Sequence, residues 1–266
     1  QMIVLAADHG GFHLKEEVKK HLEKNLNKDT IILGPTTASM FKVKNIYRFQ
    51  IIVKYKVDPM LQKSLKELDE LIMNKNKIGL FFGSFNPVHN GHLMLANYIV
   101  EFTDLDSIWF VVSPQNPFKT QQSMLDEKHR LEMLELAVRN EPRFEVCDIE
   151  FHMPKPSYTI DTLMQLSKLH PDTDFYLICG MDNLTNFHRW KNYQAILDNY
   201  HLLVYPRKGY AGGELLNHKS VQLIEAPEIE VSSTFIRDAI AKGKDIRYFM
   251  PNESYKYMID MKFYND

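Results

Sequence analysis

The chain has 266 residues, of which 44% are hydrophobic and 25% charged, and its formal net charge is −2 at pH 7. This length predicts one or two domains with their own cores, and the hydrophobic fraction excludes an intrinsically disordered chain. The sequence holds no apolar run of about 18 residues and no pattern typical of a secretory signal, so we expect neither a membrane span nor export. Two cysteines, Cys147 and Cys179, are too few for a disulfide scaffold, which favours a soluble cytoplasmic protein.

The charge is distributed unevenly along the chain. Residues 1–76 hold 13 Lys and Arg against 9 Asp and Glu, a net of +4, whereas residues 77–266 hold 19 against 25, a net of −6. The polar stretch 74–77 lies between these parts and is the predicted boundary. We therefore expect an N-terminal appendage, residues 1–76, followed by a larger domain, residues 77–266.

The appendage shows no regular pattern. Its expected strands are 3–7, 31–33 and 47–54, and its expected helices are 14–25 and 59–74. Gly34 and Pro35 follow the second strand directly, as is typical of a turn. This mixture predicts a small α+β unit.

From residue 77 onward, short apolar runs alternate with helical patterns. The expected strands are 78–82, 108–112, 144–149, 175–179 and 201–205, and the expected helices are 91–102, 126–140 and 159–169. In the second helix, Leu131, Leu134 and Val138 recur at spacings that place them on one buried face. The alternation predicts an α/β fold, a Rossmann-like doubly wound parallel sheet with helices on both faces. Ligands bind at the carboxyl ends of the strands in such sheets, so we expect functional residues in loops that follow strands.

Residues 83–93, Gly-Ser-Phe-Asn-Pro-Val-His-Asn-Gly-His-Leu, follow the first of these strands and open a helix. Gly83 and Gly91 permit tight turning, and the helix N-terminus offers free amide groups to a phosphate. His89 and His92 are three residues apart, so both imidazoles can donate hydrogen bonds on one side. A lone histidine is more often structural, and His-x-x-His can belong to a metal site, but no cysteine or carboxylate stands nearby at ligand spacing. The string as a whole favours phosphate binding.

Residues 231–237, Val-Ser-Ser-Thr-Phe-Ile-Arg, open a later helix. Ser232 or Ser233 suits the N-cap, and a simple cap with an exposed arginine is the alternative interpretation. We favour a second phosphate site, in which the first amides, the hydroxyls and the forked guanidinium of Arg237 bind oxygens.

Further candidates follow the other strands. Lys119 ends a proline-rich loop after the second strand and can contact an anion, although a solvated lysine is the alternative. Trp190 stands among polar residues, which favours a loop, and its ring can stack on a pyridinium, although a core tryptophan is more usual. Arg207 also follows a strand, the run 201–205.

The string 83–92 resembles the Gly-x-Phe-x-Pro-x-His-x-Gly-His signature of the nucleotidyltransferase superfamily, and residues 77–266 resemble the bacterial nicotinate-nucleotide adenylyltransferases. This resemblance implies transfer of AMP from ATP to nicotinate mononucleotide in NAD biosynthesis, with release of pyrophosphate and with Mg²⁺ carried on the ATP phosphates rather than in a protein metal site. A phosphopantetheine or other small-molecule adenylyltransferase of the same superfamily is the alternative.

The resemblance also implies roles for individual residues. The expected catalytic groups are His89, His92 and Arg237. The residues expected to contact ATP are Gly83, Ser84, Phe85, His89, Gly91, His92, Lys119, Ser232, Ser233, Thr234 and Arg237. Those expected to contact the mononucleotide are Asn86, Tyr158, Thr159, Gly180, Asp182, Trp190, Lys191 and Arg207. Trp190 would stack on the nicotinate ring, amides near Thr159 and after Trp190 would hold its carboxylate, and Asp182 would contact ribose. The family commonly has tyrosine where this chain has Lys191. If a main-chain amide recognises the carboxylate, the side chain at this position does not matter; otherwise the preference between acid and amide is open, and a cationic lysine would favour nicotinate over nicotinamide.

The appendage resembles fragments of two other families. Residues 2–26 are similar to the start of the B-type ribose-5-phosphate isomerases, and residues 31–75 are similar to the C-terminal piece of the primosomal replication-restart helicase. The rest of each enzyme is missing, so we expect no independent activity. Single-stranded nucleic-acid binding by residues 31–76 is the alternative from another class, but the net charge of +4 is a weak electrostatic footprint, and we expect no nucleic-acid partner. The sequence leaves open whether the chain forms a homo-oligomer.

Overall fold

A computed structural model of the chain describes residues 2–7, 20–26, 31–37, 49–54, 60–61, 63–64, 66–67, 76–114 and 124–265. The chain divides into two compact units, Gln1–Lys75 with Leu197–Tyr200 and Asn76–Ile196 with His201–Asp266. No helix within the described ranges is both long enough and apolar enough to cross a membrane.

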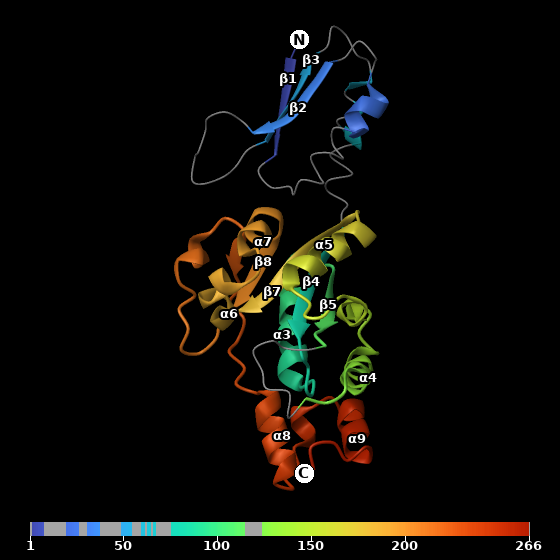
Figure 1. The fold of residues 1–266 in the computed structure, drawn as a ribbon, viewed down its shortest axis with the longest axis vertical. Helices are drawn as coiled ribbons and strands as arrows, with labels where there is room; N and C mark the ends of the chain where they lie inside the picture. Colours follow the sequence, from blue (N-terminus) through green and yellow to red (C-terminus); the bar gives the residue numbers. More distant parts are fainter. Residues whose placement is uncertain are drawn as a thin grey trace. The chain divides into compact units, whose positions relative to one another are not determined.

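The smaller unit contains a three-stranded antiparallel sheet in the order β1-β3-β2 (Figure 1). The strands are β1 (Met2–Ala7), β2 (Ile31–Thr37) and β3 (Phe49–Lys54). The prediction that β2 ends before Gly34 is wrong, because the strand continues to Thr37 and its pairing with β3 shifts register between Leu33 and Thr36. An irregularity of this kind accommodates a proline, which has no N–H to donate to the ladder.

The larger unit is built on a six-stranded sheet in the order β6-β5-β4-β7-β8-β9, in which every pair of neighbours is parallel (Figure 1). Its strands are β4 (Asn76–Gly83), β5 (Ser107–Val112), β6 (Phe144–Cys147), β7 (Thr173–Gly180), β8 (His201–Tyr205) and β9 (Val221–Leu223). The predicted doubly wound parallel sheet is confirmed. The expected strand 144–149 is too long, because residues 149–152 form a 3-10 turn in which the Phe151 N–H donates to the Asp148 carbonyl.

The chain runs from β4 outward through β5 to β6 and then returns to β7 on the other side of β4. This reversal places the topological switch point at β4 and β7, where such sheets bind ligands. The helices are α3 (Asn90–Phe102), α4 (Glu127–Val138), α5 (Thr159–Leu169), α6 (Met181–Thr185), α7 (Tyr193–Asn199), α8 (Ser233–Ala241) and α9 (Asn252–Asp260). Right-handed crossovers put α3 and α4 on one face of the sheet and α5 and α7 on the other.

Helix α4 departs from its expected pattern in one position. Leu134 and Val138 are buried as predicted, but Leu131 is only half-buried, and Arg130 is fully buried on the same side of the helix.

Helices α8 and α9 lie beyond the carboxyl ends of β4 and β5 (Figure 1). There α9 packs on α4, and the Ser254 hydroxyl donates to the Met133 carbonyl at 2.6 Å.

Candidate active site

The loop after β4 is strained and tightly packed. Gly83 is the last residue of β4, and its carbonyl accepts a hydrogen bond from the Ser113 N–H at the end of β5. Phe85 has a φ of 44°, which is a left-handed conformation that bulky residues rarely adopt. Its ring is buried, and the centroid of this ring lies 5.0 Å from the centroid of the His92 ring and 5.7 Å from that of the Phe110 ring. A conformation of this kind persists only where the surroundings hold it.

His89 and His92 stand together at the start of α3, as their spacing predicts. His89 is the N-cap residue, and the two rings stack with their centroids 3.7 Å apart. The backbone N–H of His89 donates to Nδ1 of His92 at 3.2 Å, so a neutral His92 carries its proton on Nε2. A Cβ on Gly91 would lie 3.0 Å from Nδ1 of His89, which explains the glycine at this position.

The His89 side chain is 5% exposed. Burial, together with the positive charge of Arg207, lowers its pKa from 6.5 to about 4, so the imidazole is neutral at pH 7. Its Nδ1 is buried and makes no hydrogen bond within the described part of the chain. A buried ring nitrogen without a protein partner is available to a ligand that enters the site.

The low pKa of His89 makes the stability of the fold depend on pH. Below pH 6.5 the unfolded chain binds a proton that the folded protein does not take up until about pH 4, so stability is lost as the pH falls through this window. We expect the free energy of unfolding to drop by about 2 kcal/mol between pH 8 and pH 5 because of this residue. Urea unfolding of the wild type and of His89→Asn at both pH values measures the difference, and equal losses in the two proteins would contradict the assignment.

The start of α8 is hydrogen-bonded to the loop after β4. The Ser233 hydroxyl donates to the Pro87 carbonyl at 2.9 Å, 146 residues away in sequence. Nη1 of Arg237 donates to the Asn86 carbonyl at 2.7 Å, across 151 residues. Ser232 is the N-cap of α8, and its hydroxyl accepts a hydrogen bond from the Phe235 N–H, as predicted for one of the two serines. The two predicted phosphate strings therefore form one structure.

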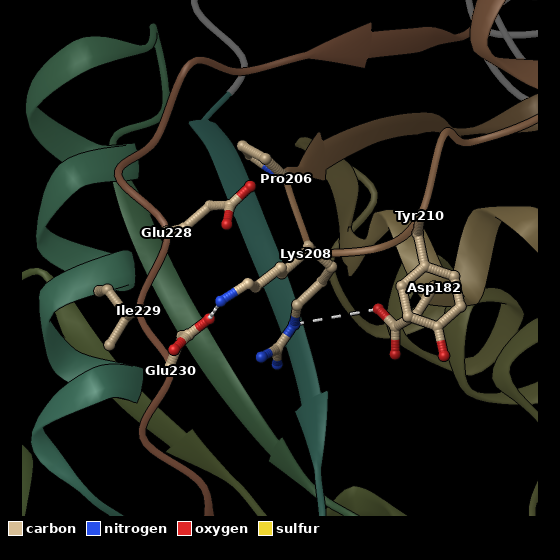
Figure 2. A pocket seen from close by; sticks show the side chains of 8 residues that line it. Asp182, Pro206, Lys208, Tyr210, Glu228, Ile229 and Glu230 are labelled. Carbon is tan, nitrogen blue, oxygen red and sulfur yellow. Dashed lines mark ion pairs between the residues drawn. The ribbon is translucent and has the colours of Figure 1, made fainter.

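Beside this structure lies a cavity of about 350 Å³ (Figure 2). Its lining includes Asp182, Arg207, Lys208, Tyr210, Glu228 and Glu230. Asp182 follows β7, Arg207 follows β8, and Oδ1 of the first lies 3.9 Å from Nε of the second. A Cβ on Gly180 would collide with the Asp182 carboxylate, so the glycine makes room for it. Sequence reasoning missed the segment 228–230, which carries no motif although it directly precedes the second phosphate string.

A second group of predicted residues gathers at the start of α5. Tyr158 is the N-cap of α5, and its carbonyl accepts a hydrogen bond from the Asp161 N–H in the first turn. Nζ of Lys191 lies 2.8 Å from Oδ2 of Asp161 and 4.4 Å from the centre of the Tyr158 ring. This contact joins the segment that carries Trp190 to α5. The positive charge of Lys191 is therefore paired with a carboxylate in this structure.

Trp190 is half-buried, and its ring centroid lies 4.9 Å from that of Phe187. A half-buried ring, backed by an apolar side chain, leaves part of its surface for a ligand.

Beneath the start of α5, the buried Glu150 accepts hydrogen bonds from Ser157 and Thr162, and burial raises the pKa of its carboxyl group. Sequence reasoning missed this carboxylate, whose contacts fix the segment 157–162.

The loop after β4 is also held from its inner side. Oδ1 of Asn86 accepts hydrogen bonds from the Tyr264 hydroxyl at 2.6 Å and from the Leu125 N–H at 3.2 Å. The buried guanidinium of Arg130 donates to the Ser84 carbonyl at 2.6 Å. Contact of Asn86 with the mononucleotide stays a prediction. In this structure its side-chain oxygen accepts hydrogen bonds from the protein. Lys119 lies outside the described residues.

No group of three or more His, Cys, Asp and Glu side chains in the described ranges is placed to hold a metal ion. A Mg²⁺ ion that arrives on nucleotide phosphates needs no such group, because phosphate and water oxygens complete its coordination.

Comparison with known proteins gives two family matches. Residues 80–239 match the cytidylyltransferase-like family, and residues 10–82 match the primosomal protein N C-terminal domain. The second match agrees with the resemblance of the appendage to the replication-restart helicase. Among solved structures, the chain is similar to the Plasmodium falciparum nicotinic acid mononucleotide adenylyltransferase complexed with NaAD, with a TM-score of 0.62 and 22% identity over 71% of this chain and 98% of that one. A likeness at this identity shows the shared fold.

Curated relatives are much closer in sequence. The chain is 50% identical over 190 residues, 71% of its length, to a Cytophaga hutchinsonii protein of which the match covers 99%. It is 48% identical over 187 residues to a Bacteroides fragilis protein, covering 70% of this chain and 93% of that protein. Both relatives carry the name "probable nicotinate-nucleotide adenylyltransferase". Because half of the 190 aligned residues are identical and the match covers nearly the whole of such a relative, the chain belongs to the nicotinate-nucleotide adenylyltransferase family.

Proposed function

We propose that the chain transfers the adenylyl group of ATP to nicotinate mononucleotide, giving nicotinate adenine dinucleotide and pyrophosphate, as a step of NAD biosynthesis. The observation that carries this proposal is the junction of the two phosphate strings through Ser233 with Pro87 and Arg237 with Asn86. This junction holds the start of α8 against the loop that leads into α3, and the N-terminus of a helix favours the binding of a phosphate.

In the reaction an oxygen of the mononucleotide 5′-phosphate bonds to the α-phosphorus of ATP, and the bond from that phosphorus to the pyrophosphate oxygen breaks. A phosphate monoester is a nucleophile near pH 7, so the site needs no general base, and catalysis consists of positioning and charge stabilisation. His89, His92 and Arg237 would donate hydrogen bonds to the transferring group, and Lys119 would contact a phosphate of ATP. Mg²⁺ carried on ATP would neutralise part of the phosphate charge.

The remaining predicted residues suit the mononucleotide and the riboses. The Asp182 carboxylate lies in the cavity and can accept hydrogen bonds from ribose hydroxyls. The ring of Trp190 would stack on the cationic pyridine ring, and the first amides of α5 would hold the carboxylate. Because Asp161 neutralises Lys191, we propose that these amides decide between acid and amide more than the lysine charge does.

Replacing Trp190 with alanine should raise KM for nicotinate mononucleotide about tenfold and leave KM for ATP unchanged. The reason is the loss of stacking between the indole and the cationic ring, which contributes about 1.4 kcal/mol to binding if KM rises tenfold. Initial-rate kinetics with each substrate varied in turn measures both constants. Equal increases in both would point to a folding defect rather than to a substrate contact.

A pyrophosphate-release assay tests the proposed function directly. ATP is supplied with nicotinate mononucleotide, nicotinamide mononucleotide or 4′-phosphopantetheine in separate reactions. We expect rapid release with the first, slower release with the second and none with the third. Release with phosphopantetheine alone would establish the alternative within the superfamily, and no release with any acceptor would reject adenylyl transfer. The proposal gives residues 1–76 no part in the reaction.

A further inference from the structure

A tyrosine near the end of the chain reaches the loop after β4. The Tyr264 hydroxyl donates to Oδ1 of Asn86 at 2.6 Å, and the two residues are 178 positions apart. The Tyr264 ring packs against the core of the larger unit, and burial raises the pKa of its hydroxyl, which therefore stays a donor at any working pH. The contact is short, partly buried and made by a group that does not titrate near neutrality.

Asn86 is the residue on which the two phosphate strings meet. Its carbonyl accepts a hydrogen bond from Arg237, and its neighbour Pro87 accepts one from Ser233. On its other side stands Phe85, whose left-handed backbone conformation is unfavourable unless neighbouring contacts hold it. A change in the side-chain orientation of Asn86 would therefore move the backbone that leads to His89 and the carbonyl that Arg237 contacts.

We propose that the Tyr264 hydroxyl is a positioning group for adenylyl transfer, because its hydrogen bond to Asn86 holds the loop 84–89 in the conformation that places His89 at the start of α3 and the Asn86 carbonyl on Arg237. The inference rests on the proposed function for its catalytic consequence. In this role Tyr264 acts through Asn86 and does not contact a substrate. A residue remote in sequence thus holds the loop in place before the substrates bind, so that less of the loop has to become ordered on binding.

The first test replaces Tyr264 with phenylalanine, which keeps the ring and removes only the hydroxyl. Tyr257→Phe is the matched control, because its hydroxyl also makes a partly buried contact, 2.9 Å from Nδ1 of His129, and that contact is with α4 rather than with the loop. We expect Tyr264→Phe to lower kcat about tenfold with less than about a twofold change in either KM, and both variants to have similar melting temperatures. A merely structural role would lower the melting temperature of Tyr264→Phe and leave kcat of the folded enzyme unchanged.

The second test asks whether the hydroxyl acts through Asn86. In an Asn86→Ala background the partner oxygen is missing, so adding Tyr264→Phe should change kcat by less than about twofold. Hydrogen exchange of backbone amides in residues 84–92 gives a readout that needs no turnover, and we expect about tenfold faster exchange in Tyr264→Phe than in the wild type or Tyr257→Phe.

These measurements separate the positioning role from the proposed function. If the wild type releases no pyrophosphate, adenylyl transfer is rejected, and the exchange rates still decide whether Tyr264 holds the loop. Unchanged exchange in Tyr264→Phe overturns the positioning role, whatever happens to kcat. A tenfold fall in kcat that persists in the Asn86→Ala background overturns the proposed route through Asn86.

Discussion

Replacing His89 with alanine is expected to lower kcat for pyrophosphate release about 100-fold, the usual cost of losing one hydrogen-bond donor to a transition state. The imidazole is buried, its pKa is lowered to about 4, and its Nδ1 has no hydrogen-bond partner in the described ranges. A neutral imidazole at the N-cap of α3 would donate to the charge that develops as the α-phosphoryl group is transferred. Its environment excludes water, which makes that hydrogen bond stronger than in solution.

The controls for this prediction separate the donor from the fold. His89→Asn keeps a short side chain suited to a helix N-cap and an N–H donor near the position of Nδ1, so it should recover part of the lost rate. His170→Ala removes an exposed histidine at the opposite end of α5, remote from the predicted phosphate strings, and should leave kcat unchanged. Wild-type turnover in His89→Ala would remove the residue from the mechanism.

The sequence suffices for the central sheet because each signal is local. Buried parallel strands are apolar runs that end in a small or polar residue, so Gly83 and Gly180 could be expected at the ends of β4 and β7, where the structure has them. Strand β9 could not be found, because it has only three residues and two of them are exposed. The meeting of the two phosphate strings was not predicted, because residues 231–237 come after β9 rather than after any of the expected strands.

The contacts behind the site could not be predicted, because each joins segments far apart in the chain. Nothing local distinguishes Tyr264 from the other tyrosines near it, and Asn86 was read only as a ligand contact. Arg130 did leave a signal, since it stands four residues before Leu134 and eight before Val138, on the apolar stripe of α4. A charged residue on such a stripe is rarely buried unless its donors are satisfied, and this one is fully buried.

Arg130 joins the loops that follow β4 and β5. Its guanidinium donates to the carbonyls of Ser84 at 2.6 Å, Ser113 at 2.9 Å and Pro114 at 3.1 Å, and to that of Leu125 at 3.0 Å. The planar fork of donors satisfies four buried or partly buried carbonyls at once, which a single ammonium cannot do. Burial lowers the pKa of the group, but arginine stays charged at pH 7, so a positive charge lies directly behind the proposed phosphate site.

Replacing Arg130 with methionine, which fills a similar volume, should lower the free energy of unfolding by about 4 kcal/mol, because four buried or partly buried carbonyls lose their donors. Arg130→Lys keeps the charge with fewer and differently directed donors, and we expect it to recover less than half of that loss. Urea unfolding at pH 7 measures both losses of stability. KM for ATP tests whether the positive charge acts on the phosphates. If it does, KM should rise in Arg130→Met and stay near the wild-type value in Arg130→Lys. A methionine variant within about 1 kcal/mol of the wild type would show that water or a shifted loop satisfies the carbonyls equally well. Because the same guanidinium holds the loops after both β4 and β5, a loss of stability together with a rise in KM would mean that one side chain serves both the fold and the site.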